Sequence, residues 1–181
     1  EAPKLRTLLR IPGDIAVWEE HENPYALIAA RLAGFDAPGA GLALDAATPF
    51  VFASALMQAV SGPVTSAQGM ISAQRQVKSP AELALMQTAM EASFRVQKAV
   101  HAGLRTGIST TEVADFIHAA HSALGLKPLF AAVQFGEATA YPHGVPHPQV
   151  LGTGDMVLVD MGGTLQGYSS DITRTYVFGT P

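Results

Sequence analysis

Two acidic residues near the end of the chain, Asp160 and Asp171, have the types and spacing to do chemistry together. An apolar, β-like run precedes Asp160, and a second such run follows Asp171. These patterns predict two strands joined as a hairpin. The segment between the two acids contains three glycines, the residue type that a tight reversal needs: Gly162, Gly163 and Gly167.

Carboxylates at the facing ends of one hairpin can share a single cation or bridge two. Without a cation, two anions held so close repel each other, and one of them has to stay protonated. The pair therefore indicates a metal site; the alternative is that Asp160 is a turn residue before two glycines and Asp171 a solvated strand residue.

The segments that must position this pair are β-rich after Pro128. We predict strands over residues 129–135, 156–161 and 168–178, with a loop over residues 136–154. His143 lies in this loop, where a lone histidine most commonly hydrogen-bonds the backbone.

Two capping boxes predict the helices that precede these strands. Ser79 and Glu82 predict a helix that ends near Gly103, and Ser109 and Glu112 predict a second one. Apolar residues at helical spacing predict the buried faces. They are Leu83, Met86, Met90, Phe94 and Val100 in the first helix, and Val113, Phe116, Ile117, Ala120 and Leu124 in the second.

His118 and His121 are three residues apart on the second predicted helix and could face one ion. Because they lie beside the apolar stripe, we interpret them instead as a solvated flank.

The first part of the chain alternates between strand-like and helix-like segments, which predicts a small α/β unit. Asn23 followed by Pro24 predicts a helix start. A domain boundary is expected near residues 75–79. The predicted strands cover residues 15–18, 41–44 and 63–66, and the predicted helices run from residue 24 to about 34 and from residue 49 to about 60.

Composition excludes several function classes. A net charge of −4 provides no electrostatic footprint for nucleic acid or an anionic membrane surface. There is no cysteine, so thiolate metal sites are excluded. No apolar run is long enough to span a bilayer, and a cytoplasmic location is compatible with these features.

Four motifs together resemble a known family. They are His-Gly-Val-Pro from His143, Gly-Asp from Gly154, Val-Asp-Met-Gly from Val159, and Gly-Tyr-Ser-Ser-Asp-Ile-Thr-Arg-Thr from Gly167. Their order and spacing resemble the pita-bread metallopeptidases: prolidases, Xaa-Pro aminopeptidases and methionine aminopeptidases, with creatinase as a metal-free relative. The Ser-Asp-Ile-Thr-Arg-Thr ending is most similar to the prolidase and Xaa-Pro aminopeptidase branch.

The resemblance implies a fold class and a domain organisation. Residues 1–75 would be an α/β remnant, the C-terminal part of a creatinase/prolidase-type N-terminal domain. Residues 76–181 would be the α+β first half of a pita-bread catalytic domain. The family also uses a His and two Glu ligands from the second half of that fold. The chain is therefore expected to be truncated at both ends.

The resemblance also implies roles for single residues. Asp160 would bind one of two divalent ions, and Asp171 would bridge both. Mn²⁺ is expected, with Co²⁺ or Zn²⁺ as alternatives. His143 would be the catalytic residue and would hydrogen-bond the substrate or the tetrahedral intermediate. From its position after Asp171, Arg174 is either a charge at the strand edge or a partner of a ligand carboxylate.

The function so implied is hydrolysis of the peptide bond that precedes proline, by a dipeptidase or an aminopeptidase. The expected partners are an Xaa-Pro peptide, the missing C-terminal half and a second copy in a homodimer. This chain alone is expected to be inactive. The alternatives are a non-catalytic pita-bread module that binds a protein partner, and a different metal-dependent hydrolase or lyase on the same fold.

Overall fold

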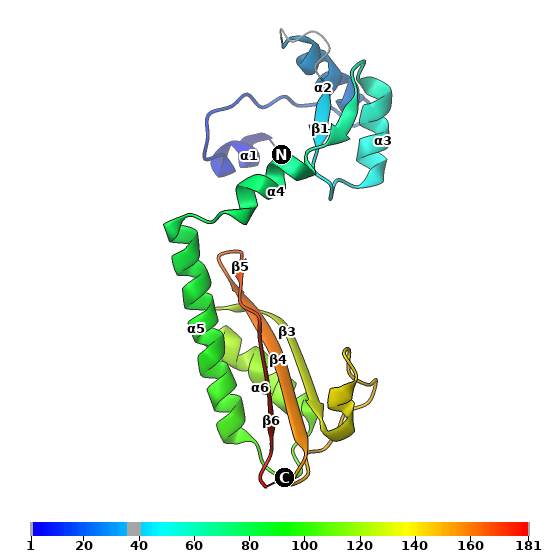
Figure 1. Ribbon diagram of the computed structural model, residues 1–181. Coiled ribbons are helices and arrows are strands. Elements are labelled where there is room, and N and C mark those ends of the chain that lie inside the picture. The colour runs from blue at the N-terminus through cyan, green and yellow to red at the C-terminus, as the bar shows by residue number, and fades with distance from the viewer. Residues whose placement is uncertain (1, 36–40, 181) are drawn as a thin grey trace. The chain divides into compact units, whose positions relative to one another are not determined.

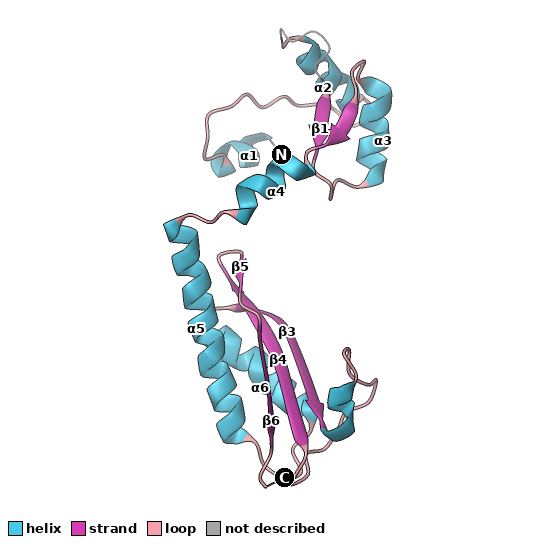
Figure 2. Cartoon of the chain, in the orientation of Figure 1, coloured by secondary structure: helices cyan, strands magenta, loops and turns pink. Residues whose placement is uncertain are grey.

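The computed structural model describes residues 2–35 and 41–180 and divides into two compact units. Unit 1 is Glu1–Val77 and unit 2 is Lys78–Pro181. Figure 1 labels their elements, and Figure 2 separates helices from strands by colour. No helix in the described ranges is both long enough and apolar enough to cross a membrane.

Unit 1 is a small α/β arrangement around two short parallel strands. Leu42 of one strand pairs with Val64 of the other. In chain order the elements are α1 (Ala2–Leu8), α2 (Pro24–Ala33), β1 (Leu42–Leu44), α3 (Phe50–Ala59), β2 (Val64–Ser66) and α4 (Gln68–Gln76). The helix α3 contacts both β2 and α2.

The sequence predicted part of unit 1 correctly. The Asn23 side chain accepts from the backbone N–H of Tyr25 at 2.9 Å, so the predicted cap starts α2. The predicted strand over residues 15–18 is wrong, because that segment is extended but pairs with neither β1 nor β2. The helices α1 and α4 were not predicted.

Unit 2 packs two helices against one antiparallel sheet. Strand β4 is central and pairs with β3 on one side and with β5 and β6 on the other. The elements are α5 (Pro80–Gly103), α6 (Thr110–Ala123), β3 (Lys127–Phe135), the 3₁₀ helix η1 (Gly136–Ala140), β4 (Met156–Leu165), β5 (Tyr168–Ser169) and β6 (Ile172–Val177).

Both predicted capping boxes are confirmed. Ser79 accepts from the N–H of Glu82, whose carboxylate accepts from the N–H of Ser79, and Ser109 and Glu112 repeat this exchange. Because each box is made by residues three apart, its geometry follows from the local sequence alone. The two helices therefore begin where the sequence indicated.

The buried face of α5 agrees with the predicted one at Val100 but differs at the larger residues. Leu83 is 54% exposed and Phe94 is 38% exposed, so the large apolar residues do not form the contact surface. Smaller side chains do, because the helix lies close to the sheet and to α6. The buried residues of α5 are Ala89, Ala92, Ser93, Val96, Gln97 and Val100. On α6, Phe116 is likewise 45% exposed.

Strands β4, β5 and β6 form one long hairpin with an unbroken register. Leu165 faces Tyr168 next to the turn, and Met156 faces Val177 at the far end. The turn is made by Gln166 and Gly167, whose φ angles are 51° and 87°. Two positive φ angles in succession are what a two-residue hairpin turn of type I′ requires.

The glycines Gly162 and Gly163 do not make the reversal, contrary to the sequence prediction. Both are buried residues inside β4. A Cβ atom on Gly162 would lie 2.4 Å from the Ser170 carbonyl oxygen and 2.7 Å from Cε1 of Phe130. These glycines are therefore needed for close approach within the sheet.

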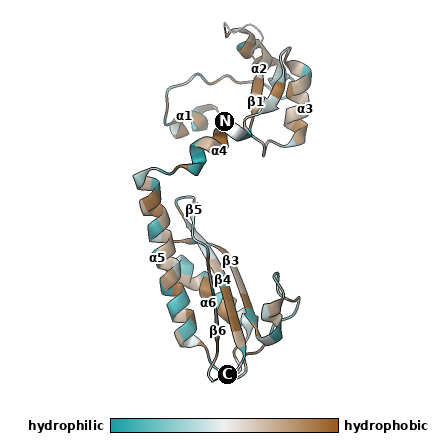
Figure 3. Cartoon of the chain, viewed as in Figure 1, coloured by the Kyte–Doolittle hydropathy of each residue, from teal (hydrophilic) through white to brown (hydrophobic). Residues whose placement is uncertain are grey.

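The hydrophobic core of unit 2 lies between the helices and one face of the sheet. Figure 3 shows the apolar character of β4 along much of its length. On this face Val157, Val159 and Met161 are fully buried, and the residues that alternate with them point to the opposite face. The core residues are Val96, Val100, Ile108, Val113, Ile117, Phe135, Leu151, Val157, Val159 and Met161.

A hydrogen bond between the hairpin and α5 makes the stability of unit 2 depend on pH. The Tyr168 hydroxyl donates to Glu82 Oε1 at 2.7 Å, and this bond, together with those from Ser79, lowers the pKa of Glu82 to about 2. A carboxylate with a lowered folded-state pKa stabilises the fold above its unfolded pKa, and the effect is lost as the pH falls toward 2. We expect Tyr168→Phe to lower the urea midpoint at pH 7 and to match the wild type more closely near pH 3.

The control for this comparison is Tyr141→Phe. The Tyr141 hydroxyl donates to Glu137 over a longer distance, 3.4 Å. We expect a smaller loss of stability in this variant. If the difference in urea midpoint between the wild type and Tyr168→Phe stayed constant from pH 7 to pH 3, the assignment of the effect to Glu82 would be contradicted.

The close approach at Gly162 yields a second prediction. In Gly162→Ala the new methyl group meets the Ser170 backbone oxygen, which cannot rotate away, so we expect a loss of about 1–3 kcal/mol in the free energy of unfolding. Gly103→Ala is the control, because nothing lies within 4 Å of its added Cβ. Urea unfolding measures both, and an equal effect in the two variants would contradict the steric explanation.

Candidate metal centre

Asp160 lies in the middle of β4 on the sheet face opposite the helices. Its pairing partner is Thr173 of β6, and the Thr173 hydroxyl donates to Asp160 Oδ1 at 2.6 Å. Residues directly opposite each other on antiparallel strands point to the same face. The hydrogen bond therefore fixes one carboxylate oxygen of Asp160 and leaves the other available.

Asp171 lies on the same face as Asp160. Ser170 is buried, Asp171 exposed, Ile172 buried and Thr173 exposed, which is the alternation of an extended chain. Asp171 thus shares the face of Thr173, and hence of Asp160. In the unbroken register it is the diagonal neighbour of Asp160, a relation that places Cα atoms roughly 7–8 Å apart. Both carboxylates can reach a common point above the sheet.

His143 lies in the loop between β3 and β4, and its side chain is exposed. It lines a hollow of about 320 Å³ together with residues of β3, among them Ala132 and Gln134. Ala132 is the residue directly opposite Asp160 on β4. The hollow also includes Thr110 of α6 and Val133 from the core-facing side of β3, so it lies at the β3 edge of the sheet, and neither Asp160 nor Asp171 lines it.

The loop is tied down at its end by Gln149. The Thr110 backbone N–H donates to the Gln149 carbonyl at 3.0 Å, and the Gln149 N–H donates to Thr110 Oγ1 at 3.2 Å. Gln149 Oε1 accepts from the N–H of Phe135 at 3.4 Å. These contacts connect the His143 loop to the start of α6 and to the end of β3.

Gln134 is a residue of this hollow that the sequence did not single out. It is only 5% exposed, and its Oε1 has no hydrogen-bond partner. Its pairing with Leu158 puts it on the same sheet face as Asp160. A polar residue in an otherwise apolar strand was the available signal.

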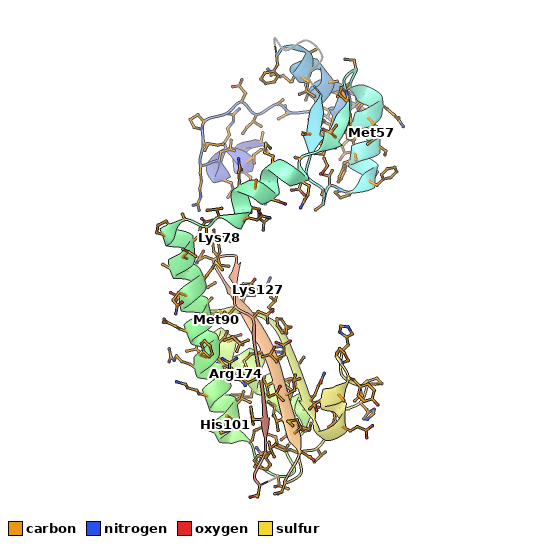
Figure 4. All side chains as sticks on the ribbon, in the orientation of Figure 1. Met57, Lys78, Met90, His101, Lys127 and Arg174 are labelled. Atoms are coloured by element: carbon orange, nitrogen blue, oxygen red, sulfur yellow. The ribbon has the colours of Figure 1, made fainter. Side chains whose placement is uncertain are left out.

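Arg174 does not contact either carboxylate, so its predicted role is wrong in this structure. Its side chain lies beside α5 in Figure 4, with the guanidinium 5.1 Å from the ring centre of Phe94 and its Nη1 donating to the Thr173 carbonyl. The period of the strand explains this, because Arg174 points to the face opposite that of Thr173. Thr173 is the residue that binds a carboxylate.

The two histidines of α6 behave differently from each other. His118 is exposed, as predicted, but His121 is 0% exposed, so the solvated flank predicted for it is wrong. His121 lies one turn after the fully buried Ile117 and therefore on the same inward face. Its burial lowers its pKa, the first and largest cause being desolvation.

The described residues fit a divalent ion in part. Asp160 and Asp171 supply hard oxygen donors on one face, which suit Mn²⁺ and similar ions. Among residues 2–35 and 41–180, however, no group of three His, Cys, Asp or Glu side chains is close enough to hold an ion. Open metal sites use about three protein ligands, so this pair needs further donors.

Comparison with known proteins agrees with the fold. The family model of metallopeptidase family M24 matches residues 84–181. A putative dipeptidase of Bacillus subtilis, YkvY, is 33% identical over 171 residues, which are 92% of this chain and 47% of that protein. The crystal structure of dipeptidase PepE from Mycobacterium ulcerans is 35% identical with a TM-score of 0.81, over 91% of this chain and 44% of that one.

A third relative carries a more specific name. The structure of an Xaa-Pro dipeptidase from Bacillus anthracis is 25% identical with a TM-score of 0.79, over 90% of this chain and 46% of that one. The chain thus spans a little under half the length of each of these three relatives. It has the mixed α/β architecture of pita-bread proteins. Because the family model matches more than half of its residues, the chain belongs to metallopeptidase family M24.

Proposed function

We propose that the complete protein hydrolyses the peptide bond preceding proline, as an Xaa-Pro dipeptidase or aminopeptidase that uses two divalent ions, with Mn²⁺ preferred over Co²⁺ or Zn²⁺. The observation that carries this proposal is the register of the long hairpin, which puts Asp160 and Asp171 on one exposed face. The names of the relatives support the reaction class.

In this proposal the chain supplies part of the metal site. Asp160 would hold an ion through the oxygen that Thr173 leaves free, and Asp171 would be a second carboxylate ligand. A pair of divalent ions supplies activation of water for attack on a carbonyl. The remaining donors come from a part of the protein beyond this chain or from a second chain, because two carboxylates are too few.

His143 is proposed to contact the substrate. It lines the hollow beside β3, where the buried Gln134 has an unused acceptor. An imidazole and an amide there can hydrogen-bond the polar atoms of a peptide and hold its scissile bond over the carboxylates. Proline removes the N–H that most proteases use, so contacts with other atoms must position such a substrate.

The domain organisation is part of the same proposal. Unit 1 would be the C-terminal part of a creatinase/prolidase-type N-terminal domain, and unit 2 the first half of the catalytic domain. The coverage of the relatives supports this organisation. We also infer a homodimer, on the resemblance alone.

The role of the carboxylates is tested by substitution in the full-length gene product that contains this chain. We expect Asp171→Asn and Asp160→Asn each to lower hydrolysis of an Ala-Pro substrate by more than about 100-fold, since loss of a ligand exceeds the effect of losing a ligand's partner. Asp115→Asn, at an exposed position of α6, is the control and should keep wild-type activity. Binding of Mn²⁺, measured by calorimetry, should fall with the activity.

The outcome of this experiment also decides between the alternatives. Full activity in Asp171→Asn would contradict the mechanism. Ion binding without hydrolysis of any Xaa-Pro peptide would indicate a different metal-dependent reaction. A wild-type protein that binds no ion would indicate a non-catalytic module.

The bond from Thr173 to Asp160 provides a finer test. Thr173→Val removes the hydroxyl with little change of shape, so Asp160 loses its orienting donor and the affinity for Mn²⁺ is expected to fall about tenfold. Thr173→Ser should retain the affinity. Thr175→Val, two residues along the same strand face and opposite Leu158, is the control. Equal affinities in Thr173→Val and Thr175→Val would refute the orienting role.

A further inference from the structure

Three polar side chains form a closed cluster inside the core of unit 2. Ser93 of α5, His121 of α6 and Ser170 of the hairpin are each 0% exposed. Ser93 Oγ lies 2.8 Å from His121 Nε2 and 2.6 Å from Ser170 Oγ. The cluster therefore joins both helices to the hairpin at one point.

A neutral His121 sets the direction of the hydrogen bond between His121 and Ser93. His121 Nδ1 lies 3.1 Å from the Ile117 carbonyl, which can only accept, so Nδ1 carries the proton. Nε2 is then an acceptor for the Ser93 hydroxyl. Ser93 Oγ can accept from the Ser170 hydroxyl, whose single proton can also be donated to the Gly163 carbonyl at 3.1 Å. Burial lowers the pKa of His121, which favours this neutral form.

A hydrogen bond between a serine hydroxyl and a histidine, as in Ser93 and His121, is also found between a catalytic serine and its general base. This pair cannot act on a substrate. Both side chains are fully buried between the helices and the sheet. Its role has to be internal to the protein.

Ser170 connects the cluster to the backbone of the hairpin through hydrogen bonds with Gly163. Its N–H donates to the Gly163 carbonyl at 2.8 Å, as in a regular strand pair. The return bond differs, because the Gly163 N–H donates to Ser170 Oγ at 3.1 Å, where a regular pair would use the backbone carbonyl. The side chain of Ser170 thus takes over one bond of the sheet.

This replacement occurs immediately before Asp171. It coincides with the short interruption between β5 and β6, which the unbroken register spans. The Ser170 side chain points inward and the next residue, Asp171, points outward. Fixing the Ser170 hydroxyl therefore fixes the orientation of the backbone from which the Asp171 side chain leaves.

Two glycines of β4 leave room for this arrangement. A Cβ atom on Gly163 would lie 3.1 Å from Cδ2 of His121, and one on Gly162 would lie 2.4 Å from the Ser170 carbonyl oxygen. The imidazole and the Ser170 backbone are thus both held against β4, two to three residues after Asp160.

We propose that the Ser93–His121–Ser170 cluster is the positioning device for Asp171, holding its carboxylate in register with Asp160 for ion binding. Asp171 itself is exposed, and no hydrogen bond of its side chain is among the contacts of the described residues, so its backbone must set its position. A buried polar network whose members are all hydrogen-bonded holds the surrounding residues in a single geometry. This inference rests on the proposed function in its use of Asp171 as a ligand.

The test uses the full-length gene product and measures two quantities other than activity. Ser93→Ala removes the middle of the cluster and leaves both ligand residues in place. Mn²⁺ affinity, measured by calorimetry, is expected to fall about tenfold, the range found for partners of metal ligands. Amide hydrogen exchange around residues 170–172, measured without metal, is expected to become faster.

The control is a core substitution on the same helix. Val100 lies seven residues after Ser93 and is 2% exposed, so Val100→Ala loosens the same helix face without touching the cluster. It should lower stability but leave Mn²⁺ affinity and exchange at residues 170–172 within about twofold of wild type. Ser170→Ala should reproduce Ser93→Ala, and the double variant should add little more, because both remove one chain of bonds.

The possible results separate this inference from the proposed function. Wild-type affinity and exchange in Ser93→Ala overturn the positioning role alone, as does an equal loss in Val100→Ala. Ion binding that Ser93→Ala weakens, with no Xaa-Pro hydrolysis by the wild type, supports the positioning role and overturns the substrate. A wild type that binds no ion overturns both.

Discussion

The unbroken register of the long hairpin is the constraint on which the candidate site depends. It is set by a turn of two residues, Gln166 and Gly167, both at positive φ. A slip of one residue would turn every side chain of the returning arm to the other face. Asp171 would then enter the core, and Arg174 would stand opposite Asp160.

The burial of one sheet face enforces the same register. Val157, Val159 and Met161 are fully buried against α5 and α6, so β4 cannot rotate without exposing them. The opposite face carries Asp160 and its partner Thr173. Successive residues of β4 point alternately to the apolar core and to the polar face. Packing of the core therefore also fixes the strand that carries the candidate site.

Membership of family M24 agrees with a sheet that has one apolar face and one face with acidic residues. The chain spans a little under half the length of the relatives compared, and its described residues bring together two acidic donors and no third. In the metal centre proposed here, the ligands would come from separate parts of the protein. Each part must hold its own ligands in place before the parts meet, because a flexible ligand would lose conformational entropy on binding. The buried cluster under Asp171 fits that need.

The sequence by itself determined the features that depend on near neighbours. The two capping boxes, the cap at Asn23 and the strands that begin at Met156 and Ile172 follow from residues a few positions apart, and the structure has them. The predicted strand over residues 168–178 is interrupted at Ser170 and Asp171. The family motifs likewise lie within single segments of the chain, so the family was predictable without coordinates.

Only the tertiary structure decided which side chains meet across the fold. It buried His121, placed Arg174 on Phe94 instead of a carboxylate, and left residues 15–18 without a strand partner. It also gave Gly162 and Gly163 a role in close packing instead of in the turn. Each of these outcomes depends on contacts between residues distant in sequence, such as Ser93 with Ser170. Local patterns do not encode such contacts, because the energy of a buried contact arises only when the elements that carry it have packed together.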